Sequence, residues 1–221
     1  SLMNIACLTD CWLLPFQTAG VLAVFSAQDF QLDTEATGRL LLAHHVALSD
    51  ADLTALHQET QGYPLAVELL AQHLERGEPY NRTTTDGVRR ELFLYYEEQV
   101  LRPMDPSVRR MLMELSVFDT ITPELARIVT GDPRVRERLE GILRVTTMLR
   151  QRALEQYQFW GLFRRFLQWE LSRHYTEEQR RSLYDRGALY YELNEEYGPA
   201  LDLYTKSGNH EKVLDLLTKN A

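Results

Sequence analysis

Lysine is scarce in this chain of 221 residues, which carries 24 basic residues against 32 acidic ones. Its lysines are Lys206, Lys212 and Lys219, close to the C-terminal end. A P-loop needs the pattern Gly-x-x-x-x-Gly-Lys-Ser/Thr, in which backbone amides and the lysine hold phosphate groups. The chain has no such pattern and no acidic Walker B strand beside it. We therefore expect neither ATPase activity nor a bound cofactor in these residues alone.

Cysteine and long apolar runs are scarce as well. Cys7 and Cys11 are too few for a disulfide framework and are not spaced as a metal or redox pair. No stretch of about 18 apolar residues predicts a membrane-spanning helix, and the N-terminus lacks the basic start of a signal peptide. These features favour a cytoplasmic protein without a membrane partner.

The net charge of −8 is unevenly spread along the chain. Residues 1–90 carry 5 basic and 11 acidic groups, residues 91–175 carry 13 and 12, and residues 176–221 carry 6 and 9. An acidic chain repels a phosphate backbone, so direct DNA binding would require a local basic face. Only the middle segment, residues 91–175, is close to neutral, so a local basic face is most compatible with that segment.

Apolar periodicity in the first part of the chain predicts a β remnant followed by a small helical bundle. Asn4–Leu8 and Val21–Ser26 are short apolar runs typical of buried strands, and two strands are too few for a stable sheet. The expected helices are 33–45, 50–61 and 64–76, with Ser49 as a cap of the second. The glycine, proline and threonine content of Gly77–Gly87 is typical of a linker.

The middle of the chain has the element order of a winged helix. After a first helix, three further helices, a small hairpin and a last helix follow one another, each with one apolar face. The expected helices are 88–101, 107–118, 122–130, 135–149 and 162–171, with the hairpin over 151–159. The predicted fold is therefore mainly α with a single small β-hairpin.

From Thr176 to the end the pattern is helical throughout. Gly187 and Ala188 are small residues on the inner face of the first helix, so we expect a neighbouring helix to approach closely there. Gly198-Pro199 and Gly208-Asn209 separate two further short helices, which resembles the start of a helical-hairpin solenoid. Because about one and a half hairpins cannot cap their own end, we expect a piece of a longer protein.

The most informative short motif is Gln61-Gly62-Tyr63-Pro64, which opens an apolar helix. A proline at the first helical position loses no hydrogen bond and presets the turn, so the motif alone is typical of the start of a core helix. It also resembles the Gly-x-Pro element of the signal-transducing ATPases with numerous domains, above all the ATP-dependent LuxR-type activators related to the maltose regulon activator. The resemblance implies that Gly62 and Pro64 lie next to a nucleotide, with the proline against the adenine.

A second run carries the same resemblance. Tyr157-Gln158-Phe159-Trp160-Gly161-Leu162-Phe163-Arg164-Arg165-Phe166-Leu167 is similar to the Tyr-Arg-Tyr-His-x-Leu-Phe-Arg-x-x-Leu run that closes the family's winged helix. The domains that the resemblance implies are the tail of an ATPase α/β domain over 1–32, a helical lid over 33–87, a winged helix over 88–175 and the start of a tetratricopeptide-like solenoid over 176–221.

The function implied by the resemblance is that of a regulatory fragment of a bacterial transcription regulator. Lid and winged helix would transmit the nucleotide and inducer state through their interfaces. ATP or ADP would bind in the parent protein, whose upstream ATPase core and downstream sensor solenoid would be the fragment's partners, together with a small-molecule or protein inducer. DNA would be bound by a separate C-terminal helix-turn-helix domain.

Two positions depart from the family pattern. Relatives place a histidine at the position of Trp160, where it reaches the β-phosphate of ADP, whereas an indole offers one hydrogen-bond donor and no charge. We expect Trp160 to be nucleotide-proximal and to replace this polar contact with apolar packing between lid and winged helix. Relatives also carry an arginine where this chain has Asp10-Cys11, and an acidic group there would repel phosphate.

Two alternative functions remain open from the sequence. The chain could be a DNA-binding winged helix that acts through Arg134, Arg138 and Arg144, although interleaved acidic residues favour a solvated face over a phosphate-binding one. It could also be a helical-repeat domain that binds another protein and has no link to nucleotides.

Histidines give a weaker signal. His44 and His45 stand at the end of the first expected helix, where an imidazolium complements the helix C-terminus. Adjacent helical positions point in different directions and no third ligand is spaced nearby, so a metal site is the less favoured interpretation.

Overall fold

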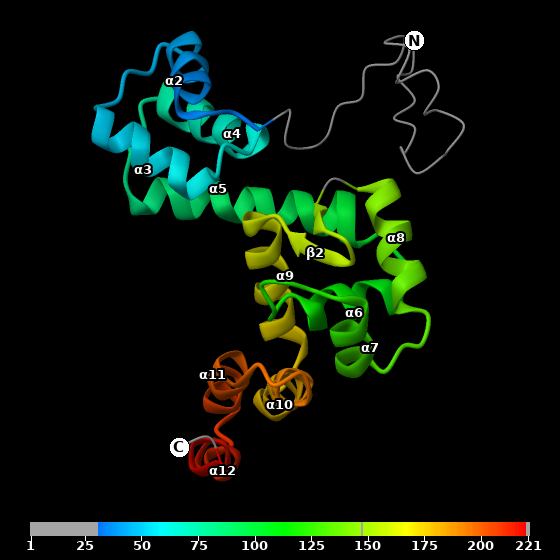
Figure 1. Cartoon of the computed structure of the whole chain (residues 1–221). Coiled ribbons are helices and arrows are strands. Elements are labelled where there is room, and N and C mark those ends of the chain that lie inside the picture. Colours follow the sequence, from blue (N-terminus) through cyan, green and yellow to red (C-terminus); the bar gives the residue numbers. More distant parts are fainter. Residues whose placement is uncertain (1–30, 147, 220–221) are drawn as a thin grey trace, which may run out of the picture. The chain divides into compact units, whose positions relative to one another are not determined.

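The computed structural model describes residues 31–146 and 148–219, which form two compact units (Figure 1). One unit extends to Pro103 and the other begins at Met104. The described part is mainly α-helical with one small antiparallel hairpin, which confirms the predicted fold class. The strands expected at Asn4–Leu8 and Val21–Ser26, as well as Asp10 and Cys11, lie outside the described residues.

In the first unit, three of the described helices begin at polar caps. Its elements are α2 (Thr34–Ala43), α3 (Asp50–Thr60), α4 (Pro64–Glu75), α5 (Arg82–Tyr95) and the π-helical segment η3 (Tyr96–Leu101). Asp33 accepts a hydrogen bond from the amide of Ala36, Ser49 from Asp52 and Asn81 from Thr84. Each cap satisfies an amide that the first helical turn leaves without a partner, which explains where the helices begin.

Helix α4 forms the centre of this unit. It packs against α2, α3 and α5, and its residues Val67, Leu70 and Ala71 are almost fully buried. Leu41 from α2 and Leu56 from α3 belong to the same apolar cluster. Burial of a leucine or valine side chain contributes about 1.5–3 kcal/mol, so the apolar face of α4 holds the bundle together.

The segment predicted as a linker, 77–87, contains the start of a helix. Helix α5 begins at Arg82 and runs through Gly87, so the expected domain boundary after residue 87 falls inside a helix. Thr84 and Thr85 are buried, and the Thr84 hydroxyl donates to the carbonyl of Pro79. The Asn81 cap and these buried threonines stabilise a helix that three threonines and a glycine disfavour on propensity alone.

The second unit begins with the winged helix. Its elements are α6 (Pro106–Leu115), α7 (Pro123–Thr130), α8 (Val135–Val145), β1 (Leu149–Ala153), β2 (Gln156–Phe159) and α9 (Gly161–His174). The strands pair antiparallel, with Leu149 opposite Phe159, and Ile121 forms an isolated bridge to Tyr157 beside them. The helix expected to reach Leu149 ends at Val145, because Leu149 pairs with the second strand of the hairpin.

Three helices complete the second unit. These are α10 (Glu177–Leu193), α11 (Tyr197–Ser207) and α12 (His210–Lys219), drawn from gold to red in Figure 1. Thr176 and Gln179 form a reciprocal capping box at the start of α10. Gly208 ends α11 in the left-handed conformation, and the amide of Asn209 donates to the carbonyl of Tyr204. This closure is typical of a helix C-terminus and separates α11 from α12.

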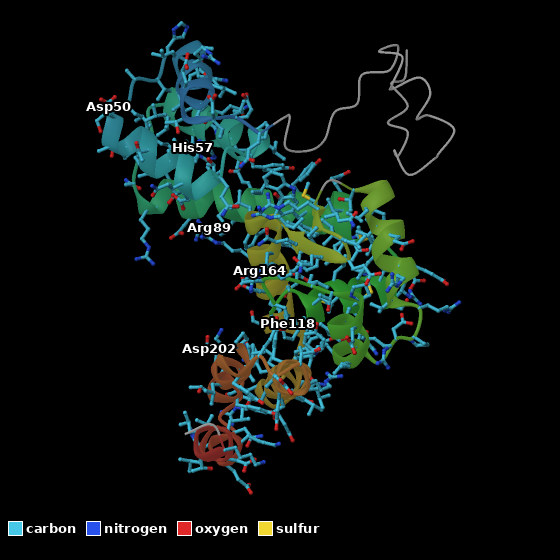
Figure 2. The ribbon with its side chains drawn as sticks, in the orientation of Figure 1. Asp50, His57, Arg89, Phe118, Arg164 and Asp202 are labelled. Atoms are coloured by element: carbon cyan, nitrogen blue, oxygen red, sulfur yellow. The ribbon has the colours of Figure 1, made fainter. Side chains whose placement is uncertain are left out.

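The helical hairpin α10–α11 packs on the winged helix through a glycine. The ring of Phe118, labelled in Figure 2, lies so close to α10 that a Cβ atom built on Gly187 would be 2.2 Å from its Cε1 atom. The Thr122 hydroxyl lies 3.1 Å from that of Tyr190, and Tyr175 donates to the buried carboxylate of Glu114 at 3.0 Å. The close approach of a neighbouring helix expected at Gly187 is therefore present through Leu203 of α11, 3.3 Å from the same Cβ position, and the Phe118 ring comes closer still.

Candidate functional site

The Gly62–Pro64 turn is shaped by the chain segment beside it. Gly62 has a φ of 65° and its carbonyl accepts a hydrogen bond from the amide of Leu32 at 2.9 Å. A Cβ atom on residue 62 would lie 2.0 Å from the carbonyl oxygen of Leu32. Glycine is therefore required here both by the backbone angle and by the contact with residue 32.

The residue between glycine and proline joins the turn to the end of α5. The Tyr63 ring lies 6.2 Å from that of Tyr96 in η3, measured between centroids. Burial raises the pKa of the Tyr63 hydroxyl and, more strongly, that of Tyr96. Both phenols therefore stay neutral, and this contact positions the start of α4. Pro64 itself stands at the first position of α4 and is partly exposed.

Trp160 lies at the junction between the hairpin and α9. Its amide donates to the Met148 carbonyl at 3.0 Å, and its carbonyl accepts from the Arg164 amide at 2.7 Å. The side chain is 8% exposed, and its buried indole Nε1 donates to no acceptor among the described residues. The guanidinium carbon of Arg150 lies 5.0 Å from the ring centroid, a cation–π distance. The burial of the Trp160 side chain agrees with a role in apolar packing. Its indole N–H, which has no acceptor among the described residues, is also available to donate a hydrogen bond to a ligand.

The wing carries two arginines that share one acceptor. The Gln158 side-chain oxygen accepts from Arg150 Nη2 at 2.7 Å and from Arg152 Nε at 2.9 Å. Neither guanidinium lies within ion-pair distance of a carboxylate in the described part of the chain. Burial and the charge of Arg152 lower the pKa of Arg150. This pair was not predicted from the sequence, although residues two apart on a strand share a face, so the spacing of Arg150 and Arg152 was the signal that could have revealed it.

The arginines proposed for DNA binding on α8 differ in their surroundings. Arg138 forms an ion pair with Asp132 at 2.7 Å and donates to the Ser107 hydroxyl. Arg134, which immediately precedes the helix, is exposed. Arg144 lies on α8, and its side chain is outside the described part. The neighbouring Arg136 is paired with Glu155 at the tip of the hairpin. The charges of Arg136 and Arg138 are therefore neutralised within the protein.

The run that resembles the family's closing motif has a structural role. Leu162, Phe163 and Phe166 are buried in the winged helix. Arg164, labelled in Figure 2, forms an ion pair with Asp119 and donates through Nε to the carbonyl of Ser116 at 2.8 Å. It thereby satisfies a carbonyl at the C-terminus of α6, where a cation also complements the helix dipole.

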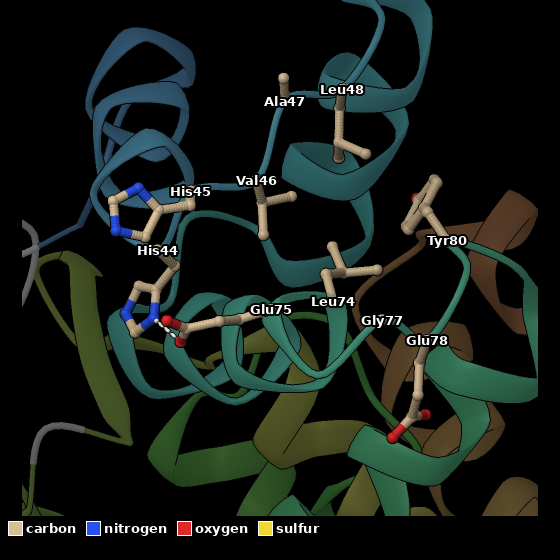
Figure 3. Close-up of a pocket in the computed structure, with 10 residues that line it drawn as sticks. All are labelled: His44, His45, Val46, Ala47, Leu48, Leu74, Glu75, Gly77, Glu78 and Tyr80. Carbon is tan, nitrogen blue, oxygen red and sulfur yellow. Dashed lines mark hydrogen bonds and ion pairs between the residues drawn. The ribbon is translucent and has the colours of Figure 1, made fainter.

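A pocket lies in the first unit at the opposite end of α4 from Pro64. Figure 3 shows its wall, which the α2–α3 connection and the residues after α4 form around a volume of ≈ 480 Å³. Leu74 and Glu75 line it, about 16 Å along the helix axis from Pro64 at 1.5 Å per residue. This pocket is therefore separate from the Gly62–Pro64 turn, which the family resemblance associates with a bound nucleotide.

Histidines join the helices around this pocket. His44 follows the last residue of α2, and its two ring nitrogens lie 2.8 Å from Glu75 and 3.2 Å from Glu68, as Figure 3 shows for Glu75. His73 of α4 contacts Glu78 at 2.7 Å and Glu91 of α5 at 2.9 Å. Within residues 31–146 and 148–219, no three His, Cys, Asp or Glu side chains form a group that could hold a metal ion.

The residues assigned to the nucleotide belong to different units. Gly62 and Pro64 stand in the first unit, whereas Trp160 stands in the second. That Gly62, Pro64 and Trp160 lie near the same bound nucleotide stays a prediction. Among the described helices, none is long and apolar enough to cross a membrane.

A comparison with protein families supports the winged-helix assignment. The family model of the MalT winged helix domain matches residues 97–179, from η3 into the first turn of α10. No curated protein matches the chain. Residues 97–179 are thus similar to the winged helix of MalT-type regulators, which supports a relation to such regulators and a regulator-type module.

Proposed function

We propose that this chain is a regulatory segment of an ATP-dependent LuxR-type transcription activator. In this proposal the winged helix and the α10–α11 hairpin move as one body and transmit the nucleotide and effector state between the ATPase core and the sensor. The observation that carries the proposal is the packing of Phe118 against Gly187, in a module similar to the MalT winged helix.

The rigidity of this body follows from two contacts of different chemistry. Separation of α10 from the winged helix would expose the Phe118 ring and break the hydrogen bond between Thr122 and Tyr190. Exposure of a buried aromatic side chain to water is unfavourable by about 1.5–3 kcal/mol. A displacement of the winged helix would therefore carry the hairpin with it.

The residues present fit a nucleotide only in part. The Trp160 indole N–H and the nearby Arg150 guanidinium are donors that could contact a phosphate oxygen. Gly62 does not leave space for a ligand, because its Cα faces the Leu32 backbone. When bound, ATP or ADP would supply negative charge and ATP alone would supply the γ-phosphate that is hydrolysed, and a P-loop upstream in the parent protein would hold these phosphates.

A second candidate function, direct DNA contact, is favoured by one observation. Arg150 and Arg152 of the wing have no carboxylate partner among the described residues, whereas Arg138 of α8 is paired. Submicromolar affinity for duplex DNA in physiological salt, lost on Arg152→Glu but not on Arg165→Glu, would favour this function. We rank it second because Arg136 and Arg138 of α8 are paired with carboxylates, which reduces the positive charge that this helix would present to a major groove.

Substitution of Trp160 in the complete regulator tests the first proposal. We expect Trp160→Ala to raise basal activation and trypsin sensitivity, because the buried indole contributes roughly 1.5–3 kcal/mol to the closed arrangement. Trp160→His should increase the preference for ADP over ATP, since an imidazole can donate to phosphate. Trp169→Ala is the matched control, because that indole on α9 is 39% exposed. Unchanged activation and proteolysis in Trp160→Ala would contradict the proposal.

A further inference from the structure

A second hollow lies in the helical hairpin region, apart from the residues discussed above. The first turns of α10 form one wall, and the end of α11 with the start of α12 forms the other, around a volume of ≈ 440 Å³. We call it the α10–α12 groove. Its charged and aromatic lining side chains are Glu177, Arg180, Arg181, Tyr184, Lys206 and His210.

The charges of this groove do not cancel. Glu177 is its one acidic lining residue, and it is paired with Arg181. Arg180 and Lys206 have no carboxylate within ion-pair distance in the part of the chain that the structure describes. The Nε atom of Arg180 is buried and lacks an acceptor among the described residues. The groove is thus a positive site within a segment whose overall charge is negative.

The helix ends around the groove reinforce this polarity. His210 is the first residue of α12, and the side chain of Asn209 accepts from the Lys212 amide at 3.3 Å. The N-terminus of a helix carries partial positive charge from its aligned peptide dipoles. Asp185 on α10 accepts a hydrogen bond from the Asn209 side-chain amide at 3.4 Å. The partial positive charge at the start of α12 therefore adds to the charge of Arg180 and Lys206.

We propose that the α10–α12 groove binds a phosphate monoester, as the effector site of the sensor part. The inference rests on the proposed function for its regulatory meaning and on the groove for its chemistry. Guanidinium, ammonium and phenol groups are donors, so the matching ligand is one rich in acceptors, and arginine recognises phosphate oxygens in a bidentate manner. The volume of ≈ 440 Å³ lies within the range of about 300–1,000 Å³ typical of small-ligand pockets.

Isothermal titration calorimetry on the 221-residue chain tests the proposal. The probes are glucose 6-phosphate, inorganic phosphate and citrate. We expect glucose 6-phosphate to bind with a dissociation constant below about 1 mM, and more weakly at high salt, because exposed charges are screened. Arg180→Gln and Lys206→Gln should each weaken binding about tenfold, since each removes a charged donor.

Matched controls remove the same charge elsewhere. Arg165→Gln changes an exposed arginine of α9, and Lys219→Gln changes an exposed lysine at the end of α12 that is paired with Asp215. Both should bind the probe as the unmodified chain does. Lys206 is exposed, so Lys206→Gln keeps the test valid even if Arg180→Gln fails to fold, which circular dichroism will show.

The outcomes separate the sources of the anion. Tighter binding of the ester than of inorganic phosphate supports a phosphorylated metabolite, and equal binding supports free phosphate at the same site. Binding of citrate alone, no binding of any probe, or binding that Lys206→Gln leaves unchanged would overturn the proposal. None of these results depends on Trp160, so failure here is distinguishable from failure of the nucleotide-linked function.

Discussion

The two units join their helices in different ways. In the first unit, His44 and His73 link neighbouring helices through carboxylates near the surface, around an apolar core centred on α4. In the second unit, α10 approaches the winged helix closely enough that only a glycine fits beside Phe118. Contacts of the first kind depend on protonation, and contacts of the second kind depend on shape. The units should therefore respond to different perturbations.

The largest effect is expected from Gly187→Ala in the second unit. The new methyl group would lie 2.2 Å from the Phe118 ring, so ring or helix must move. Overpacking of a core costs about 1–3 kcal/mol, and we expect the upper end, with a melting temperature lower by roughly 10 °C. Urea unfolding followed by near-ultraviolet circular dichroism measures it.

A control and a compensating variant test the cause. Gly198→Ala, on the neighbouring α11, introduces a Cβ with no heavy atom within 4 Å and should be neutral or slightly stabilising. Adding Phe118→Leu to Gly187→Ala should restore part of the lost stability. If the two glycine variants unfold at the same urea concentration, shape does not determine this interface.

An intermediate effect is expected from Gly62→Ala in the first unit. The substitution forces alanine into a φ of 65° and places its Cβ 2.0 Å from the Leu32 carbonyl. We expect a loss of about 2 kcal/mol, of which the left-handed backbone accounts for about half. Gly77→Ala is the matched control, because φ is 89° there and no heavy atom lies within 4 Å. Equal losses in urea unfolding would show that the contact with residue 32 contributes nothing.

The smallest effect is a pH dependence of the first unit. Hydrogen bonds that the His44 ring donates to the carboxylates of Glu75 and then Glu68 raise the pKa of His44 above 6.5. The stabilisation is therefore complete below that value and is lost as the pH rises through the raised pKa. Thermal unfolding should show a lower midpoint for this unit at about pH 8 than at about pH 6. His44→Gln should flatten this difference, whereas His45→Gln, at the exposed next residue, should retain it.

Local signals predicted much of the helical fold. Pro64 and Thr176 mark helix starts because a proline at the first position and a capping side chain act within one turn. The hairpin and α9 followed from alternation and helical spacing of apolar residues. The start of α5 was missed, because Thr84 and Thr85 are poor helix formers that become favourable only when buried.

The candidate site was less predictable. The sequence identified Gly62, but the backbone of Leu32, a segment about 30 residues away, explains why the position must be glycine. Interleaved charges around α8 were recognised in the sequence, but neither the pairing of Arg138 with Asp132 nor the shared acceptor of Arg150 and Arg152 was predicted. Contacts across a hairpin or between helices depend on register, which composition does not encode.

By itself, the sequence determined the kind and order of elements: a helical bundle, a winged helix with one small hairpin, and helical hairpins after Thr176. These depend on periodicity, caps and turn residues, which act over a few positions. Only the tertiary structure decided which side chains face Gly187, which arginines lack a carboxylate partner among the described residues and where the α10–α12 groove lies. Those properties arise when segments far apart in the chain pack in close contact. Steric exclusion then determines which residues fit beside one another, and desolvation determines which polar groups need a partner.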